Sequence, residues 1–230
     1  MSKPKLLDLF CCAGGAAMGY SRAGFDVVGV DINPQPRYPF EFHQGDALEF
    51  VAKYGHEFDA IHASPPCQRY SSITATSGNR SDHPDLIEPV RYLLNANGRP
   101  WIMENVPRSP LRNPVTLCGV ALGLRLGKYV LRRHRLFESS IALLSAGCGC
   151  YRGDGITMGV YGGGTSTKER NPNTNGGRPY KGTSKERKEI MDMPWASARE
   201  VNQAIPPAYT EYLGKQLIQQ LAAQEQSNSE

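Results

Sequence analysis

The sequence predicts an α/β protein built on a doubly wound, mostly parallel sheet. Short runs rich in Val, Ile, Leu and Phe alternate along the first half of the chain with segments of helical pattern. Such alternation is typical of parallel strands joined by helices that cover both faces of a sheet. Gly and Pro lie at the ends of the runs and mark the turns between them. Ligands of such sheets bind beyond the carboxyl ends of the strands.

Each element follows from a local pattern. Apolar runs that predict strands cover residues 5–10, 26–32, 58–64 and 100–106. A glycine pair after the first run leads into small residues at helical spacing, which Gly24 ends. A helix is predicted over 85–98, and another begins at the proline pair 206–207, because apolar residues then recur at every fourth position.

Residues 138–190 differ from the rest of the chain. They are rich in Gly, Thr and Asn, and carry seven Lys or Arg against three Glu between positions 165 and 190. This composition argues against a strong helix and predicts a small, loop-rich lobe. A mobile basic segment and plain disorder are equally compatible with residues 163–185. The chain is therefore divided into a catalytic part, 1–137 with 190–224, and a lobe at 138–189.

Composition bounds the class of protein. The 230 residues are 40% hydrophobic, enough for one sizeable core, and carry a net charge of +4 that is compatible with a polyanionic partner. No apolar window is long enough for a membrane helix, and the N-terminus lacks a signal-peptide pattern. We therefore expect a cytoplasmic protein whose six cysteines are reduced thiols.

The expected strand ends carry side chains suited to a ligand. The turn Phe10 to Gly15 allows close approach of the backbone, since glycine lacks a Cβ. Asp31 and Asp46 follow later strands, where they suit a ribose diol and an adenine amino group. Together they indicate an adenosine-bearing cofactor, although the dinucleotide motif G-x-G-x-x-G is absent. The alternative is that both carboxylates cap helices or turns.

Cys67 stands behind Pro65 and Pro66 at the end of the third expected strand. The prolines fix a rigid, extended bend that would hold the thiol beyond the sheet. Rigid placement suits a nucleophile, whereas a buried structural thiol is the simpler alternative. Glu104 and Asn105 end the next strand and should lie beside it, where a carboxyl group of raised pKa could donate a proton.

Two clusters further along the chain are ambiguous by themselves. Arg133 and Arg135 alternate onto one face of an extended segment, where they could hold phosphate or a carbonyl, or form a solvated basic strand. A zinc set could be proposed from Cys118, His134, Cys148 and Cys150. The C-x-C spacing lacks the usual two-residue gap, so no metal is predicted.

Taken in order, these motifs resemble those of the cytosine-C5 DNA methyltransferases. DLFCCAGG is similar to the family's cofactor turn, SPPCQ to its nucleophile loop, ENV to its Glu-Asn-Val strand and RRHRLF to its R-x-R segment. NQAIPPAY is similar to a stretch near the family's C-terminus. The resemblance spans roughly residues 5–137 and 190–220. It implies the S-adenosylmethionine-dependent methyltransferase fold with a reduced target recognition lobe.

The resemblance also implies a bound S-adenosylmethionine. Phe10 and Ile32 would lie against the adenine, Asp31 would hold the ribose hydroxyls, and Asp46 would meet the adenine amino group. The cofactor contacts implied in full are Phe10, Cys12, Gly14, Gly15, Asp31, Ile32, Asp46 and Gln203.

The implied reaction is methylation of C5 of cytosine in double-stranded DNA. Cys67 would attack C6 of a cytosine extruded from the duplex, while Glu104 bonds its N3 and Arg133 and Arg135 hold base and backbone. Further substrate contacts are expected from Pro66, Gln68, Ser71 and Asn105. The family resemblance implies a role in DNA methylation, such as restriction-modification, in the cytoplasm of a prokaryotic or viral host cell. It implies no obligate protein partner.

Three departures from the family pattern leave more than one function open. Cys12 replaces a glycine, Ile32 replaces a tryptophan, and Asn202-Gln203 replaces a Gly-Asn pair. The first two would weaken cofactor packing, and the third leaves transfer of a different group possible. Methylation of RNA at cytosine C5 and DNA binding without catalysis are compatible with the same sequence.

Overall fold

The fold is described from a computed structural model. The described residues are 3–71, 79–150, 155–161 and 180–227. In that part of the chain no helix is both long enough and apolar enough to span a bilayer. The predicted mobile or disordered segment at 163–185 lies mostly outside the described residues.

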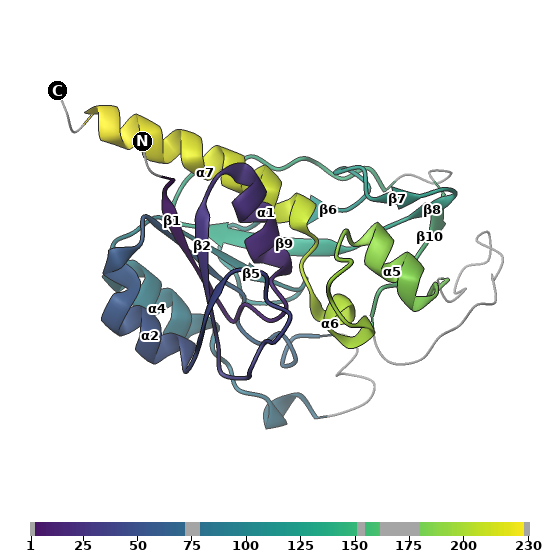
Figure 1. The fold of residues 1–230 in the computed structure, drawn as a ribbon, viewed down its shortest axis with the longest axis horizontal. Coiled ribbons are helices and arrows are strands. Elements are labelled where there is room, and N and C mark those ends of the chain that lie inside the picture. The colour runs from purple at the N-terminus through teal and green to yellow at the C-terminus, as the bar shows by residue number, and fades with distance from the viewer. Residues whose placement is uncertain (1–2, 72–78, 151–154, 162–179, 228–230) are drawn as a thin grey trace.

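A seven-stranded sheet forms the centre of the molecule, in the order β3-β2-β1-β4-β5-β9-β6 (Figure 1). Its first five strands are parallel, and β9 runs antiparallel to both β5 and β6. The strands are β1 Lys5–Leu9, β2 Asp26–Asp31, β3 Glu41–Gln44, β4 Ala60–Ala63, β5 Trp101–Asn105, β6 Val115–Cys118 and β9 His134–Ser139. The predicted doubly wound, mostly parallel sheet is confirmed.

Helices cover both faces of this sheet. Helices α1 (Gly15–Ala23) and α7 (Pro207–Ser227) pack together on one face, and α2 (Ala47–Tyr54) and α4 (Ile87–Asn97) on the other. Two short 3-10 helices, η1 (Gly55–Glu57) and η2 (Arg80–Asp82), lie in the connections. The predicted helices at 85–98 and after the proline pair are confirmed.

The strands read as continuous apolar runs because both faces of the sheet are buried. Leu6 packs into the core beneath α1 and α7, whereas its neighbour Leu7 packs into the core beneath α2 and α4. Both side chains are fully buried. Successive side chains of a strand point to opposite faces of the sheet. A strand that alternated apolar and polar residues would therefore have placed its polar side chains in one of the two cores.

A second, three-stranded sheet lies at one end of the molecule, with strand order β10-β8-β7 (Figure 1). It consists of β7 Arg125–Leu126, β8 Tyr129–Val130 and β10 Ile156–Thr157. This sheet takes strands from both sides of residue 138, where the small lobe was expected to begin. The division of the chain into 1–137 with 190–224 and 138–189 stays a prediction.

Two helices lie near the second sheet, α5 (Ser184–Ile190) and α6 (Ala198–Gln203). The expectation of no strong helix within 138–190 is wrong at α5. A capping box begins this helix: Thr183 Oγ1 accepts from the Glu186 N–H at 3.2 Å, and Glu186 Oε2 accepts from the Thr183 N–H at 2.7 Å. Two backbone donors are thereby satisfied at the first turn, which offsets the glycine-rich context.

Close packing of α1 against α7 depends on Gly19. A Cβ at this position would overlap the Pro207 carbonyl oxygen and the Thr210 hydroxyl. Gly19→Ala is therefore expected to destabilise the fold by about 2–3 kcal/mol in urea unfolding, because neither backbone can retreat. Gly45→Ala is the matched control, since a Cβ there meets nothing within 4 Å. Equal midpoints for the two variants would contradict this account.

Candidate active site

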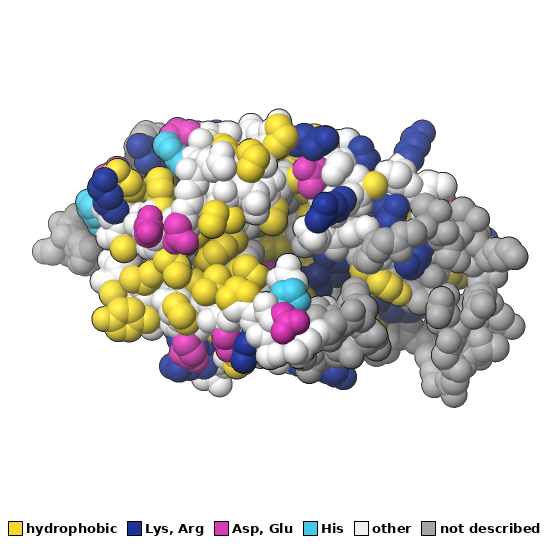
Figure 2. All heavy atoms as spheres, turned by 90° about the horizontal axis from the view of Figure 1, so that it is seen from below, with side chains coloured by type: hydrophobic (Ala, Val, Ile, Leu, Met, Phe, Trp, Pro, Cys, Tyr) yellow, Lys and Arg dark blue, Asp and Glu magenta, His cyan; other side chains and the backbone are white. Residues whose placement is uncertain are grey.

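A cavity of about 1540 Å³ opens beyond the carboxyl ends of the parallel strands. The loops after β1, β2 and β4, the end of β5 and the start of β9 all contribute to it, together with the segments 157–161 and 198–205. Figure 2 views the molecule from below Figure 1 and shows hydrophobic side chains gathered on this face beside a hollow bordered by Lys and Arg. The position agrees with the expectation for a sheet of this topology.

The turn after β1 adopts an unusual backbone. Phe10 and Cys12 have φ angles of 59° and 45°, and Gly14 has φ 77°. These values lie in the left-handed region, which L-residues other than glycine rarely adopt. A glycine would suit position 12 better, and the cysteine there costs conformational energy. The strain is tolerated because the Cys12 N–H donates to Asp31 Oδ2 at 3.1 Å.

Asp31 anchors this end of the cavity. Its side chain is buried, and besides Cys12 it accepts from the Asn33 N–H at 2.9 Å through Oδ1. The carboxylate is thus held rigidly while still lining the cavity. Next to it, Ile32 is 65% exposed, an unusual state for a large apolar side chain, and it lines the same cavity. An apolar, flat ligand group would cover it favourably.

The loop after β4 places Cys67 at the wall of the cavity. The buried Asn105 amide donates from Nδ2 to the Pro65 carbonyl at 3.0 Å, which fixes the start of the proline pair to β5. On the far side the Cys67 carbonyl accepts from the backbone N–H groups of Tyr70 and Ser71, both at 3.0 Å. The thiol is therefore held on a segment braced at both ends.

Glu104, at the end of β5, lies near this thiol. Its side chain is 8% exposed, and Oε1 forms an ion pair with Arg135 Nε at 2.9 Å. Among the described residues Oε1 has no aligned hydrogen-bond partner, so the oxygen keeps its capacity to bond a ligand. Burial raises the pKa of Glu104, against the opposing effect of Arg135 and Arg133.

The thiol and the carboxyl group influence each other. Burial and the Glu104 charge raise the pKa of Cys67, while Arg135 and Arg133 lower it. The free protein therefore holds Cys67 as a thiol at neutral pH. Protonation of Glu104 removes the negative charge that raises the pKa of Cys67, and so favours the thiolate. The protonation of Cys67 therefore depends on the charge of Glu104.

Comparison with known proteins identifies the family to which this arrangement belongs. Residues 4–112 match the C-5 cytosine-specific DNA methylases. The Type II methyltransferase M.XorII of Xanthomonas oryzae pv. oryzae is 30% identical over 122 residues, which cover 46% of this chain and 29% of that protein. Residues 4–112 of this chain therefore form a C-5 cytosine-specific DNA methylase domain.

Two further similar proteins are covered almost completely by the alignment. M.HgiGI, a Type II methyltransferase of Herpetosiphon aurantiacus, is 28% identical over 120 residues, covering 46% of this chain and 94% of that protein. The solved structure of the Entamoeba histolytica methyltransferase EhMeth aligns with a TM-score of 0.59 at 12% identity, covering 96% of this chain and 99% of that one. At that identity the likeness concerns the fold. The chain spans about a third of the length of the curated relatives that it matches first.

Most site residues predicted from the sequence come together in the cavity. Those that line it are Phe10, Cys12, Gly15, Asp31, Ile32, Pro66, Cys67, Gln68, Ser71, Glu104, Arg133, Arg135 and Gln203. Whether they contact a cofactor or substrate stays a prediction. Three predicted residues, all within the described part of the chain, do not line the cavity, namely Gly14, Asp46 and Asn105.

Each of these three residues has a structural role. Asp46 caps α2, where its Oδ1 accepts from the Leu48 N–H at 2.8 Å and the Glu49 N–H at 3.1 Å. Asn105 braces the proline pair through its bond to Pro65. Gly14 makes room for a neighbouring loop, since a Cβ there would lie 2.8 Å from Pro39 Cδ. The capping role considered for the aspartates thus describes Asp46 well.

Arg133 has a structural role that the sequence did not predict, and its contact with base and backbone stays a prediction. Its guanidinium group is buried and donates from Nη1 to the Val160 carbonyl, and from Nη2 to the carbonyls of Asn202 and Ala204 at 3.1 and 3.0 Å. It therefore ties together two segments of the cavity wall. Arg135 is the arginine that pairs with Glu104. Sequence alone could not distinguish the roles of Arg133 and Arg135, because both are arginines expected on the same face of an extended segment.

Asp8 is a site residue that the sequence reasoning missed. It lies on β1, lines the cavity, is fully buried, and neither carboxylate oxygen has a hydrogen-bond partner among the described residues. Burial, reinforced by the Asp31 charge, raises the pKa of Asp8 to about 8. The signal in the sequence was an acid in the middle of an apolar run.

The raised pKa of Asp8 predicts a dependence of stability on pH. The folded protein keeps a proton that the unfolded chain releases above about pH 4, so the free energy of unfolding falls as the pH rises from about 4 to about 8. Asp8→Asn should remove much of this fall, on the order of a few kcal/mol. Urea unfolding at pH 5 and pH 8 measures it, and equal pH dependence in both proteins would refute it.

Proposed function

We propose that this chain transfers a methyl group from S-adenosylmethionine to C5 of cytosine in double-stranded DNA. The observation that carries the proposal is the convergence of Cys67, Glu104 and Arg135 in one cavity, opposite a rigid acid and an exposed apolar side chain. A nucleophile, a proton donor and a nucleoside-binding edge are the three parts that this reaction needs.

The residues at the β1 and β2 ends fit an adenosine-bearing group. The buried Asp31 carboxylate has a fixed orientation and can accept from ribose hydroxyls, while Phe10 and the exposed Ile32 offer apolar surface for a purine ring. When bound, S-adenosylmethionine supplies an electrophilic methyl group on a sulfonium. Gly15 also lies at this wall, where a Cβ would overlap the Ile205 carbonyl. These features support the fit that the sequence motif implied.

Cys67 and Glu104 each contribute one part of the activation of the pyrimidine ring. C5 of cytosine is a poor nucleophile until sulfur adds to C6, and this addition turns the ring into an enamine. Cys67 loses its thiol proton to solvent and forms the S–C6 bond, while protonated Glu104 donates at N3 so that negative charge does not build up on the ring. After methylation, loss of the C5 proton restores the double bond and expels the Cys67 thiolate.

The substrate base has to leave the duplex to reach this thiol. A stacked cytosine is inaccessible, so its extrusion into the cavity beside Pro66, Gln68 and Ser71 accompanies binding. The basic lobe expected at 138–189 would contact phosphates and make binding salt-dependent, and a short target sequence would be read by its loops. Much of its basic segment lies outside the described residues.

Transfer of tritium from labelled S-adenosylmethionine tests the proposal. Duplex DNA should become labelled, and digestion to nucleosides should yield 5-methylcytosine. Label in RNA instead of DNA would assign the activity to RNA, and a heavier 5-substituent in mass spectra would show that another group is transferred. Absence of label in either nucleic acid, with binding to DNA intact, would make the chain a binding protein.

A further inference from the structure

Four potential metal ligands meet at the edge of the central sheet, outside the reacting cluster. Cys118 ends β6 and His134 begins β9, and the two are direct cross-strand partners in the antiparallel pair. Their side chains therefore leave the same face of the sheet. Cys148 and Cys150 approach from the chain that follows β9. One ligand atom from each of the four residues lies within 4.8 Å of every other.

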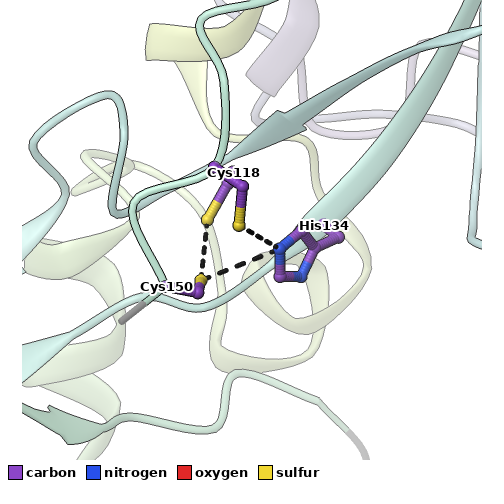
Figure 3. A group of neighbouring side chains, drawn as sticks. Cys118, His134 and Cys150 are labelled. Carbon is purple, nitrogen blue, oxygen red and sulfur yellow. Dashed lines mark hydrogen bonds between the residues drawn. The ribbon is translucent and has the colours of Figure 1, made fainter. Parts of the chain in front are cut away.

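The separations suit a small tetrahedral ion. Cys118 Sγ lies 3.1 Å from Cys150 Sγ, and His134 Nε2 lies 3.3 Å from Cys148 Sγ and 3.7 Å from Cys150 Sγ. Tetrahedral zinc with ordinary bond lengths needs S to S separations of about 3.8 Å and S to N separations of about 3.6 Å. Figure 3 shows the side chains of Cys118, His134 and Cys150 directed toward one another.

We propose that Cys118, His134, Cys148 and Cys150 bind one Zn²⁺ ion. Three thiolates and one imidazole fill all four tetrahedral positions, so the site is closed to substrate and structural in character. Binding takes up the metal and releases the three thiol protons to solvent. The ion joins the end of β6 and the start of β9 to residues 148–150.

The metal site lies next to residues that shape the cavity. His134 lies between Arg133, which ties the cavity wall together, and Arg135, which pairs with Glu104. A metal bond to His134 therefore fixes the start of β9, which carries Arg135 and directly follows Arg133. The same ion attaches the chain that leads toward β10 and the small sheet. We expect the metal to hold these two regions in register.

The short C-x-C spacing is accommodated by the backbone around it. Gly147 has φ 77°, which turns the chain just before Cys148. Gly149 packs closely against the chain that follows β6, since a Cβ there would lie 3.1 Å from Val120 Cγ1. The C-x-C spacing alone predicts no metal site. The pairing of β6 with β9 supplies the other two ligands, because it brings Cys118 and His134 together from other parts of the chain.

A disulfide is the main rival for these cysteines. All six cysteines are free thiols, and the Cys118 to Cys150 separation of 3.1 Å exceeds a disulfide bond of about 2.05 Å. Oxidation of that pair would remove two of the four ligands. Metal binding and disulfide formation are therefore mutually exclusive and can be told apart.

Metal analysis of the purified full chain tests the proposal. Protein expressed in zinc-supplemented medium should carry about one zinc per chain by plasma mass spectrometry. Cys148→Ser and Cys150→Ser should lose most of it. Cys67→Ser is the matched control, because it removes a thiol outside the cluster and should keep the zinc. Addition of a strong chelator should lower the melting temperature of the wild type and not that of Cys148→Ser.

A second measurement decides the matter if the serine variants do not fold. Cobalt added to the metal-free wild type should give the intense visible bands and sulfur charge-transfer absorption of tetrahedral thiolate coordination. Wild type without zinc and without these bands would overturn the proposal. So would a thiol titration in denaturant that finds two cysteines oxidised, or zinc that survives in both serine variants.

Discussion

Replacement of Cys67 with Ala is expected to reduce methyl transfer to cytosine by at least about 10⁴-fold. Without the sulfur no covalent bond forms at C6, so C5 never becomes the enamine carbon that accepts the methyl group. The cavity itself should persist, because the bend at Pro65 and Pro66 is held by Asn105 and not by the thiol. Base-resolution sequencing of 5-methylcytosine in DNA from expressing cells measures the loss.

Cys67→Ser serves as the near-isosteric comparison. A hydroxyl fills almost the same space but is a far weaker nucleophile at neutral pH, so its activity should also fall close to background. Both variants should keep the wild-type melting temperature within a few degrees and should still bind S-adenosylmethionine in calorimetry. Substantial 5-methylcytosine from either variant would rule out Cys67 as the attacking group.

Glu104→Gln is expected to lower kcat by about 10²–10⁴-fold, the usual range for removal of a positioned acid. The amide can still donate a hydrogen bond to N3 but cannot transfer a proton. Loss of the carboxylate also frees Arg135 from its ion pair. Because proton transfer matters in the transition state more than in binding, kcat should fall much more than the affinity for DNA.

Glu88→Gln is the matched control for this variant. Glu88 lies on α4, pairs with Arg91 and Arg112, and is exposed outside the cavity. The control loses one carboxylate and its arginine contacts, as Glu104→Gln does, and its kcat should stay within about twofold of wild type. A Glu104→Gln enzyme with wild-type kcat would remove Glu104 from the chemistry.

The sequence predicted the central fold well because its signals are local and consistent. The runs at 26–32, 58–64 and 100–106 are mostly apolar, and each contains a strand whose residues are almost all buried. Strand order follows from the connections between such elements, which are short and right-handed. The second sheet was not predicted, since strands of two residues, such as Arg125–Leu126, carry no periodicity.

The site was predictable where residues follow the ends of parallel strands. Cys67 after β4 and Glu104 at the end of β5 meet because those ends share one edge of the sheet. Positions set by loop geometry were less predictable. By sequence, Asp46 could cap a helix or bind a ligand. The structure shows the cap, with the backbone N–H groups of Leu48 and Glu49 as donors, and the ligand contact stays a prediction.

Roles that depend on distant segments could not be predicted from sequence. The hydrogen bonds of Arg133 go to Val160 and to carbonyls near residue 203, none of which is close in sequence. Cys118 and His134 likewise become neighbours only through the pairing of β6 with β9. In both cases the side chain was visible in the sequence but its partners were not.

The central claim is that the Cys67 sulfur bonds covalently to C6 of an extruded cytosine. A duplex containing 5-fluorocytosine at the methylated position tests it, because fluorine cannot leave as a proton does and the adduct cannot resolve. Incubation with the protein and S-adenosylmethionine should give a denaturation-resistant complex, and peptide mass spectrometry should place the nucleotide on Cys67. Methylation of ordinary DNA without such a complex, or an adduct on another residue, would contradict the account.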